Sequence, residues 1–178
     1  MKITMLCGNP SAGGRTTALG MEVARALASL LGAQEPSAPI ELAEHTQGLF
    51  SWGHEELAAV VREVAESDFI VIATPTYKAS FTGLLKSFLD QYGAGSLRNR
   101  VVLPVFTGGS AAHSLAPDYT LRPLLAELGA SVPGSSLYVM TSELERQSEI
   151  VADYIEVNRY VLLGAAHGVS LARQGVEG

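Results

Sequence analysis

The chain has 178 residues, of which 47% are hydrophobic and 17% are charged, and its formal net charge is −6. This length and hydrophobic content predict a globular chain, with one domain over residues 1–168 and a flexible tail over residues 169–178. Lys and Arg are scattered, which argues against nucleic acid as a partner because a phosphate backbone selects a clustered basic face. The hydrophobic runs are too short to span a membrane, so we expect no membrane partner either.

The chain contains one cysteine, Cys7, which excludes a framework of disulfides within the chain and favours a reducing compartment. The first residues have the pattern of a strand rather than that of a secretory signal. We therefore expect a cytoplasmic protein. Cys7 lies at the end of that strand and is interpreted as a small buried apolar residue.

Hydrophobic periodicity predicts strands that alternate with helices. In chain order, the predicted elements are a strand at 3–7, a helix at 16–31, a short strand at 40–42, a helix at 55–66, a strand at 69–73, a helix at 82–92, a strand at 101–106, a helical segment at 111–128, a strand at 136–140 and a helix at 149–166. Pro117 and Pro123 predict a kink or a break in the eighth element. The sequence of the segment 34–53 does not settle its role.

This alternation predicts an α/β fold with a parallel sheet and right-handed crossovers. Five strands suit a flavodoxin-like, doubly wound five-stranded parallel sheet with strand order 2-1-3-4-5. In such a fold, ligands bind beyond the carboxyl ends of the strands. The loops there are 8–17, 74–82 and 107–113, and all three are rich in Gly, Pro, Ser or Thr.

The first loop joins a strand to a helix and is rich in glycine, which is how α/β proteins hold a phosphate group. Gly8 and Gly13 have the spacing of a Walker A loop, but Gly14 stands where the lysine is required, and the dinucleotide fingerprint is absent. A mononucleotide-type phosphate site remains. The alternative is a plain turn between strand and helix in which Thr16 is the helix N-cap.

The second loop predicts a binding site for a flat ring over residues 75–78. The alternative places Tyr77 in the core and leaves Lys78 as a solvated charge. Further along, Lys86 and Asp90 are interpreted as an i,i+4 pair on the surface or as a subunit contact.

In the third loop, Gly108 and Gly109 allow the backbone to lie against a planar ligand, and Ser110 is predicted to cap the next helix. His113 is either structural or chemical. His45 and His54 lack the neighbouring cysteines or carboxylates of a metal site, so no metal is expected. The sequence also lacks a Gly-x-Ser-x-Gly nucleophile motif, which favours chemistry carried by a cofactor.

Three segments carry a resemblance to a known family: GNPSAGGRTT, ATPTYKASFTGLLKSFLD and VVLPVFTGGSAAHSLAPDYTLRPLL. From residue 1 to about 166, the chain resembles the flavodoxin-like NAD(P)H-dependent FMN reductases, and most of all the reductase component of two-component alkanesulfonate monooxygenases. By this resemblance the cofactors are FMN and NAD(P)H. The implied cofactor-binding residues are Ser11, Arg15, Thr16 and Thr17 around the phosphate, Pro75, Thr76, Tyr77 and Lys78 along the ring and ribityl chain, and Thr107, Gly108, Gly109 and Ser110 at the pyrimidine edge. The polar groups of the first loop add Asn9 as a candidate for the phosphate, although Asn9 and Ser11 stand where relatives often have serine and arginine.

The resemblance implies hydride transfer from nicotinamide to FMN without a catalytic side chain, with His113 and Tyr119 as modulators. In the sulfonate-linked members, a tyrosine at the position of Tyr119 forms a π-bulge at the subunit interface and accompanies the use of flavin as a substrate. Ordinary helix packing is the alternative for Tyr119. A monooxygenase partner and a homodimer or homotetramer are expected. The rival functions are a quinone or azo reductase that retains its FMN and a flavodoxin-type electron carrier, for which Tyr77, Phe81 and the unplaced Trp52 are the candidate aromatic residues.

Overall fold

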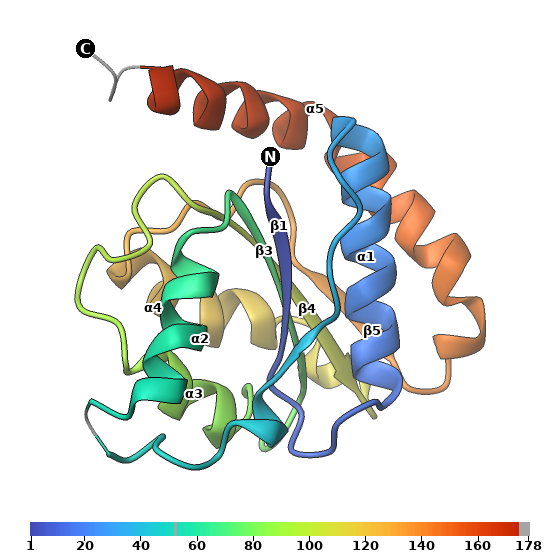
Figure 1. The fold of residues 1–178 in the computed structure, drawn as a ribbon. Helices are drawn as coiled ribbons and strands as arrows, with labels where there is room; N and C mark the ends of the chain where they lie inside the picture. The colour runs from blue at the N-terminus through green and yellow to red at the C-terminus, as the bar shows by residue number, and fades with distance from the viewer. Residues whose placement is uncertain (52, 175–178) are drawn as a thin grey trace.

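The computed structural model describes residues 1–51 and 53–174, so Trp52 lies outside the described residues. Its centre is a five-stranded parallel sheet with the order β2-β1-β3-β4-β5, which confirms the predicted topology (Figure 1). The strands are β1 (Ile3–Cys7), β2 (Ile40–Glu41), β3 (Phe69–Pro75), β4 (Val101–Gly108) and β5 (Leu137–Met140).

Helices cover both faces of the sheet (Figure 1). One face packs against α1 (Arg15–Leu31) and α5 (Gln147–Gln174). The other packs against α2 (Glu55–Ala65), α3 (Gly83–Leu89) and α4 (Arg122–Glu127). Short helical turns complete the chain: η1 (Leu42–Glu44), η2 (Ala111–His113), η3 (Pro117–Leu121) and η4 (Leu144–Arg146).

The continuous apolar run of β3 is explained by the two helical layers. Phe69, Val71 and Ala73 pack into the core beneath α1 and α5. Ile70 and Ile72 point the other way, into the core beneath α2, α3 and α4. Successive side chains of a strand point to opposite faces, so a strand buried on both faces must be apolar throughout.

Two strands extend further than their apolar runs predicted. The strand β3 continues to Pro75, and β4 continues through Thr107 to Gly108. Their pairing ends with Pro75 opposite Thr107. The prediction that Thr107 and Gly108 belong to a loop is therefore wrong, because the backbone ladder continues after the side chains become polar or small.

The last helix is longer than predicted. It was expected to end near Ala166, but α5 extends to Gln174, so the expected tail is helical as far as that residue. Val169 is buried against the core, and Arg173 forms an ion pair of 2.7 Å with Asp68, whose side chain is fully buried. These contacts hold the last turns of α5, which were expected to belong to a flexible tail. Residues 175–178 lie outside the described residues.

The proline-containing segment 111–128 is not one regular helix, in line with the predicted kink or break. It begins with η2, continues as the π-helical turn η3 and then becomes α4. The N–H of Arg122 donates to the carbonyl of Pro117, five residues earlier. Pro123 has no N–H to donate, which removes the α-helical partner of the carbonyl four residues before it. The two prolines therefore flank a widened turn.

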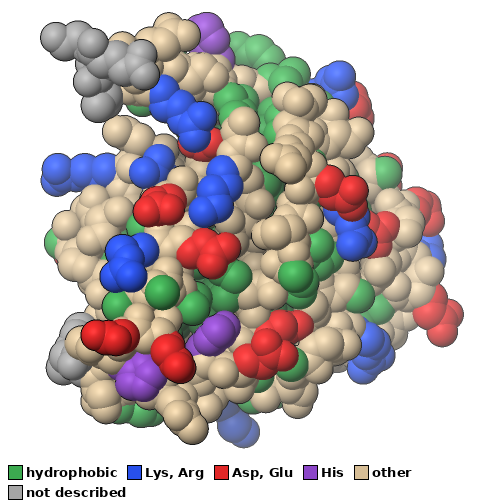
Figure 2. All heavy atoms as spheres, viewed as in Figure 1, with side chains coloured by type: hydrophobic (Ala, Val, Ile, Leu, Met, Phe, Trp, Pro, Cys, Tyr) green, Lys and Arg blue, Asp and Glu red, His purple; other side chains and the backbone are tan. Residues whose placement is uncertain are grey.

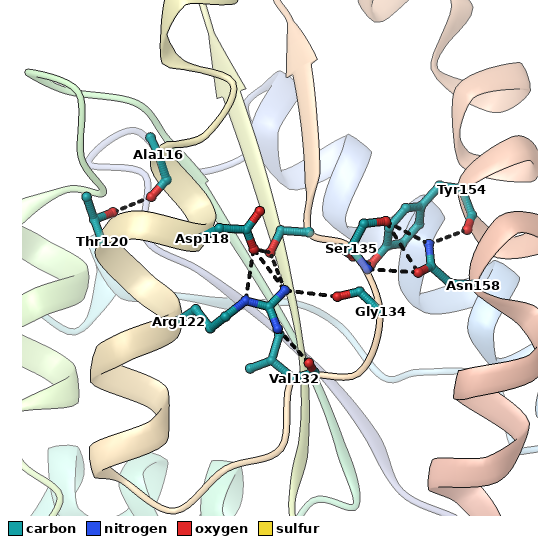
Figure 3. Close-up of polar contacts among 10 residues, drawn as sticks. Ala116, Asp118, Thr120, Arg122, Val132, Gly134, Ser135, Tyr154 and Asn158 are labelled. Atoms are coloured by element: carbon teal, nitrogen blue, oxygen red, sulfur yellow. Dashed lines mark hydrogen bonds and ion pairs between the residues drawn. The ribbon is translucent and has the colours of Figure 1, made fainter.

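Side-chain contacts fix this widened turn against the rest of the fold. The Arg122 guanidinium lies between Asp118 of η3 and the segment that leads into β5, where it donates to the carbonyls of Val132 (2.7 Å) and Gly134 (2.9 Å) (Figure 3). The adjacent Ser135 is held by Asn158 of α5. The turn is thus tied to both β5 and α5.

The surface shows mixed charge on the face in Figure 2, where basic and acidic side chains are interspersed. Lys86 and Asp90 form the predicted i,i+4 ion pair, at 2.6 Å and half exposed, so this interpretation is confirmed. Among the helices of the described residues, none is long and apolar enough to cross a membrane.

Candidate functional site

The three predicted loops meet at the carboxyl edge of the sheet, where direct hydrogen bonds join them. The hydroxyls of Thr16 and Thr107 lie 2.8 Å apart and connect the first loop to the third. The N–H of Thr76 donates to the carbonyl of Thr107 at 2.7 Å and connects the second to the third. Thr82 donates its hydroxyl to the carbonyl of Gly8 at 2.6 Å. The loops therefore form one continuous surface.

The start of α1 is left open. Its N-cap is Gly14, which offers no side chain to the helix, so the alternative in which Thr16 is the N-cap is wrong. The first backbone hydrogen bond of the helix runs from Ala18 to Gly14. Within the described residues, the N–H groups of Arg15, Thr16 and Thr17 have no acceptor. Three parallel donors at the positive end of a helix of 17 residues form a cradle for an anion.

The polar side chains of this first loop divide into two groups. Ser11 and Arg15 are exposed. Thr16 and Thr17 are 4% and 7% exposed, and the Thr17 hydroxyl lies 3.3 Å from the sulfur of Cys7. Asn9 accepts a hydrogen bond from the N–H of Ser11 at 3.1 Å and so shapes the loop. The buried hydroxyls thus hold the loop in place, while exposed groups and backbone donors face outward.

The second loop contains a tight turn closed by hydrogen bonds between Tyr77 and Ser80. Its two central residues, Lys78 and Ala79, have φ values of 52° and 62°, a left-handed conformation that is unfavourable without glycine. Strained turns of this kind gather at ligand sites. The Tyr77 ring is 52% exposed, so the alternative that places it in the core is wrong. Thr76 has a buried hydroxyl without a partner among the described residues.

The third loop follows Gly108, at which a Cβ atom would overlap the hydroxyl of Tyr138. That hydroxyl donates to the carbonyl of Ser110 at 2.7 Å and fixes the loop. Ser110 caps η2 by accepting from the N–H of Ala112 at 3.3 Å, which confirms the predicted cap. A Cβ at position 108 would displace the Tyr138 hydroxyl, whereas a Cβ at Gly109 would meet open space.

Two further predicted residues lie beside this surface. His113 is half-buried on η2, one turn beyond Ser110. Tyr119 is on the π-helical turn and is 75% exposed. The predicted π-bulge at Tyr119 is therefore present, and ordinary helix packing does not describe this exposed ring. Within the described part of the chain, no polar contact joins Tyr119 to the three loops.

Three residues at this surface were missed from the sequence. Thr82 caps α3, a role that its position just before a helical apolar run can signal. Tyr138 comes from the strand β5, where nothing in the pattern indicates a contact with the third loop. Glu41 is 6% exposed and accepts from the N–H of Gly13 at 2.9 Å. A partner 28 residues away leaves no local signal.

The thiol of Cys7, the last residue of β1, is buried directly before the first loop. Burial raises the pKa of Cys7 to about 11, with the carboxylate of Glu41 raising it slightly further and a hydrogen bond from Thr17 opposing the shift. The thiol is therefore neutral at physiological pH, which agrees with the interpretation of Cys7 as a small buried residue and not as a nucleophile. In the described residues, no three His, Cys, Asp or Glu side chains gather as a metal site.

Comparisons with known proteins agree with this geometry. Residues 1–144 match the family described as NADPH-dependent FMN reductase. The chain is 34% identical over 149 residues to the NADH-dependent FMN reductase SfnE of Pseudomonas putida, across 81% of this chain and 79% of that protein. It is 43% identical over 81 residues to the FMN reductase (NADPH) of P. putida strain KT2440, a match that spans 46% of this chain and 41% of that relative.

The solved structures include the apo form of the NADH:FMN oxidoreductase EmoB. It superposes with a TM-score of 0.78 and 30% identity over 92% of this chain and 89% of that one. The match to the family model and the similarity to SfnE each cover most of the chain. The chain therefore belongs to the NADPH-dependent FMN reductase family.

Proposed function

We propose that this protein is an NAD(P)H-dependent FMN reductase, which transfers a hydride from the nicotinamide to FMN and supplies the reduced flavin to a monooxygenase of the sulfonate-desulfurising type. The main structural support for a phosphate site is the set of backbone N–H groups at the start of α1 that have no acceptor in the described part of the chain. Membership of the family and the similarity to FMN reductases support the reaction. The name of SfnE supports only NADH-dependent FMN reduction, and the partner is our inference.

The residues present fit a flavin mononucleotide along the joined loops. The N–H groups at the start of α1, with Ser11 and Arg15, suit the phosphate. Residues 75–78 suit the ribityl chain and one side of the ring, and the backbone from Thr107 to Ser110 suits its pyrimidine edge. Gly109 fits this role because a Cβ there would meet no atom of the described residues within 4 Å, whereas the missing Cβ of Gly108 makes room for the Tyr138 hydroxyl that fixes the loop.

When bound, FMN supplies the two-electron redox chemistry, and the side chains act by binding and orientation. The hydrogen bonds that join Thr16 to Thr107 and Thr82 to Gly8 hold the loops in one arrangement, so that a ring and a nicotinamide meet in a fixed geometry. Backbone N–H groups near Gly109 are placed to stabilise negative charge at the pyrimidine edge. No protein acid or base is assigned to the hydride step.

Steady-state kinetics of the purified chain test this proposal. We expect rapid oxidation of NADH or NADPH that depends on added FMN, with a sequential mechanism and little flavin bound on purification. A ping-pong mechanism with tightly bound flavin would instead show a quinone or azo reductase. If no nicotinamide is consumed with FMN, FAD or riboflavin, the reductase function is refuted and an electron carrier becomes the better description.

We also propose that the protein is a homodimer or homotetramer, with the π-helical turn at a subunit contact. Tyr119 on this turn and Leu115 just before it are 75% and 59% exposed, and Val157 and Tyr160 on α5 are 80% and 89% exposed. Exposed apolar side chains gathered on neighbouring elements are typical of interfaces. We expect Tyr119→Ala to change both the oligomeric mass and flavin retention, and Tyr119→Phe to change neither. Unchanged mass and retention in Tyr119→Ala would refute the role of the turn.

A further inference from the structure

Glu41 places a carboxylate beneath the first loop. It ends β2 and pairs in register with Cys7 of β1, so both side chains lie on the face covered by α1. Its Oε1 accepts from the N–H of Gly13, its carboxylate interacts with the neighbouring Cys7 thiol, and its buried Oε2 has no backbone or hydroxyl donor among the described residues. A buried carboxylate oxygen without a partner is costly, so its retention calls for an explanation.

The contact with Gly13 has two opposite consequences for an anion in this loop. Gly13 has a φ of +67°, which turns its N–H inward to Glu41 and not outward to a ligand. The glutamate thereby fixes the loop in the shape that presents the N–H groups of α1. At the same time its negative charge lies under the anion cradle, and no ion pair within the described residues neutralises it.

We propose that Glu41 is a positioning and specificity residue that weakens the hold of the first loop on the flavin phosphate. Its carboxylate shapes the loop through Gly13, while its charge opposes the phosphate dianion, so that FMN binds in a defined place and still leaves readily. Charges away from bulk water interact strongly because solvent screens them little. This inference rests on the proposed function, in which this loop holds the phosphate.

The charge and the hydrogen bond can be separated by substitution. Glu41→Gln retains a carbonyl oxygen for the N–H of Gly13 and removes the charge. Glu44→Gln makes the same change of charge at an exposed residue of the neighbouring turn η1 and serves as the matched control. Riboflavin, which lacks the phosphate, reports on the ring site alone.

The experiment is a fluorescence titration of FMN and riboflavin into the full chain and both variants. For Glu41→Gln we expect FMN to bind roughly tenfold more tightly, the scale of effect that one adjacent like charge has on an ionisation. Riboflavin affinity should stay within about twofold. Glu44→Gln should change neither affinity. Equal shifts for both flavins, or weaker FMN binding in Glu41→Gln, would overturn the proposal.

Two further measurements keep the result interpretable. If Glu41→Gln does not fold at the titration temperature, Glu41→Asp retains the charge on a shorter side chain. Its ratio of FMN to riboflavin affinity must then rise by far less than the roughly tenfold expected for loss of the charge, and a rise of about tenfold with the charge retained overturns the proposal. If the unmodified chain binds both flavins equally and Arg15→Ala changes nothing, the loop does not hold the phosphate and the proposed function of this loop fails as well.

Discussion

The hydrogen bond between Thr16 and Thr107 gives the sharpest test of how the site is assembled. The two hydroxyl oxygens lie 2.8 Å apart, and the residues are 4% and 3% exposed. Replacing either threonine by valine keeps the shape but leaves the other hydroxyl buried without a partner. Such an orphaned group costs about 1–3 kcal/mol of unfolding free energy, whereas replacing both partners with apolar groups can be nearly neutral. We therefore expect a coupling energy of about 1–2 kcal/mol in a double-mutant cycle.

The assays are urea unfolding for stability and fluorescence titration for FMN affinity. A second buried hydroxyl pair, Thr4 with Ser67 at 2.6 Å, lies at the opposite, amino end of the strands and provides the control. We expect Thr16→Val and Thr107→Val to lower both stability and FMN affinity, the latter by about fivefold for one lost contact of about 1 kcal/mol. Thr4→Val should lower stability alone. If Thr16→Val and Thr107→Val unfold more easily yet bind FMN normally, the Thr16–Thr107 pair does not belong to the flavin site.

Three further predictions concern single positions. Gly108→Ala pushes the hydroxyl of Tyr138 off its hydrogen bond with Ser110 and should weaken FMN binding, whereas Gly164→Ala in α5, where a methyl group meets open space, should bind FMN normally in the same titration. Ala79 has a left-handed backbone conformation that glycine adopts without strain, so Ala79→Gly should raise the unfolding free energy in urea by about 1 kcal/mol. As a control, Ala59→Gly in the exposed part of the helix α2 should lower it by about as much. Burial raises the pKa of Cys7 from 9.0 to about 11, so the neutral thiol contributes stability that is fully present below pH 9 and is lost as the pH rises towards 11. The free energy of unfolding in urea should fall between pH 8 and pH 11, and this decrease should be smaller in Cys7→Ala than in the unmodified chain by as much as about 3 kcal/mol. Equal decreases in the two proteins would contradict the raised pKa of Cys7.

The sheet was predictable because its signals are local. The apolar runs that became β3 and β4 are typical of strands buried on both faces, and the alternation with helices then favours a parallel topology. The ends of elements were less predictable. Strand β4 continues through Thr107 because its carbonyl pairs with Thr76, and α5 continues because Arg173 reaches Asp68. Such contacts join residues far apart in the chain, and no local pattern encodes them.

The site was predictable to the level of its loops but not of its contacts. The density of Gly, Ser and Thr after the strands identified all three loops. Thr16 and Thr17 were predicted as outward phosphate ligands, yet their hydroxyls are buried against Thr107 and Cys7, and only their backbone N–H groups remain open. Glu41 was undetected, because a single acidic residue in a two-residue strand looks like an ordinary edge position.

The open start of α1 has a consequence for the lifetime of the protein in the cell. Unpaired donors at a helix terminus make that end of the helix easy to unravel, and a bound anion closes it. A ligand that binds only the folded chain stabilises it by mass action, by about 2.7 kcal/mol at a hundredfold excess over its dissociation constant. Proteases that cleave the opened chain would then remove the protein fastest when its ligand is scarce, so that abundance follows the supply of flavin without any dedicated regulator.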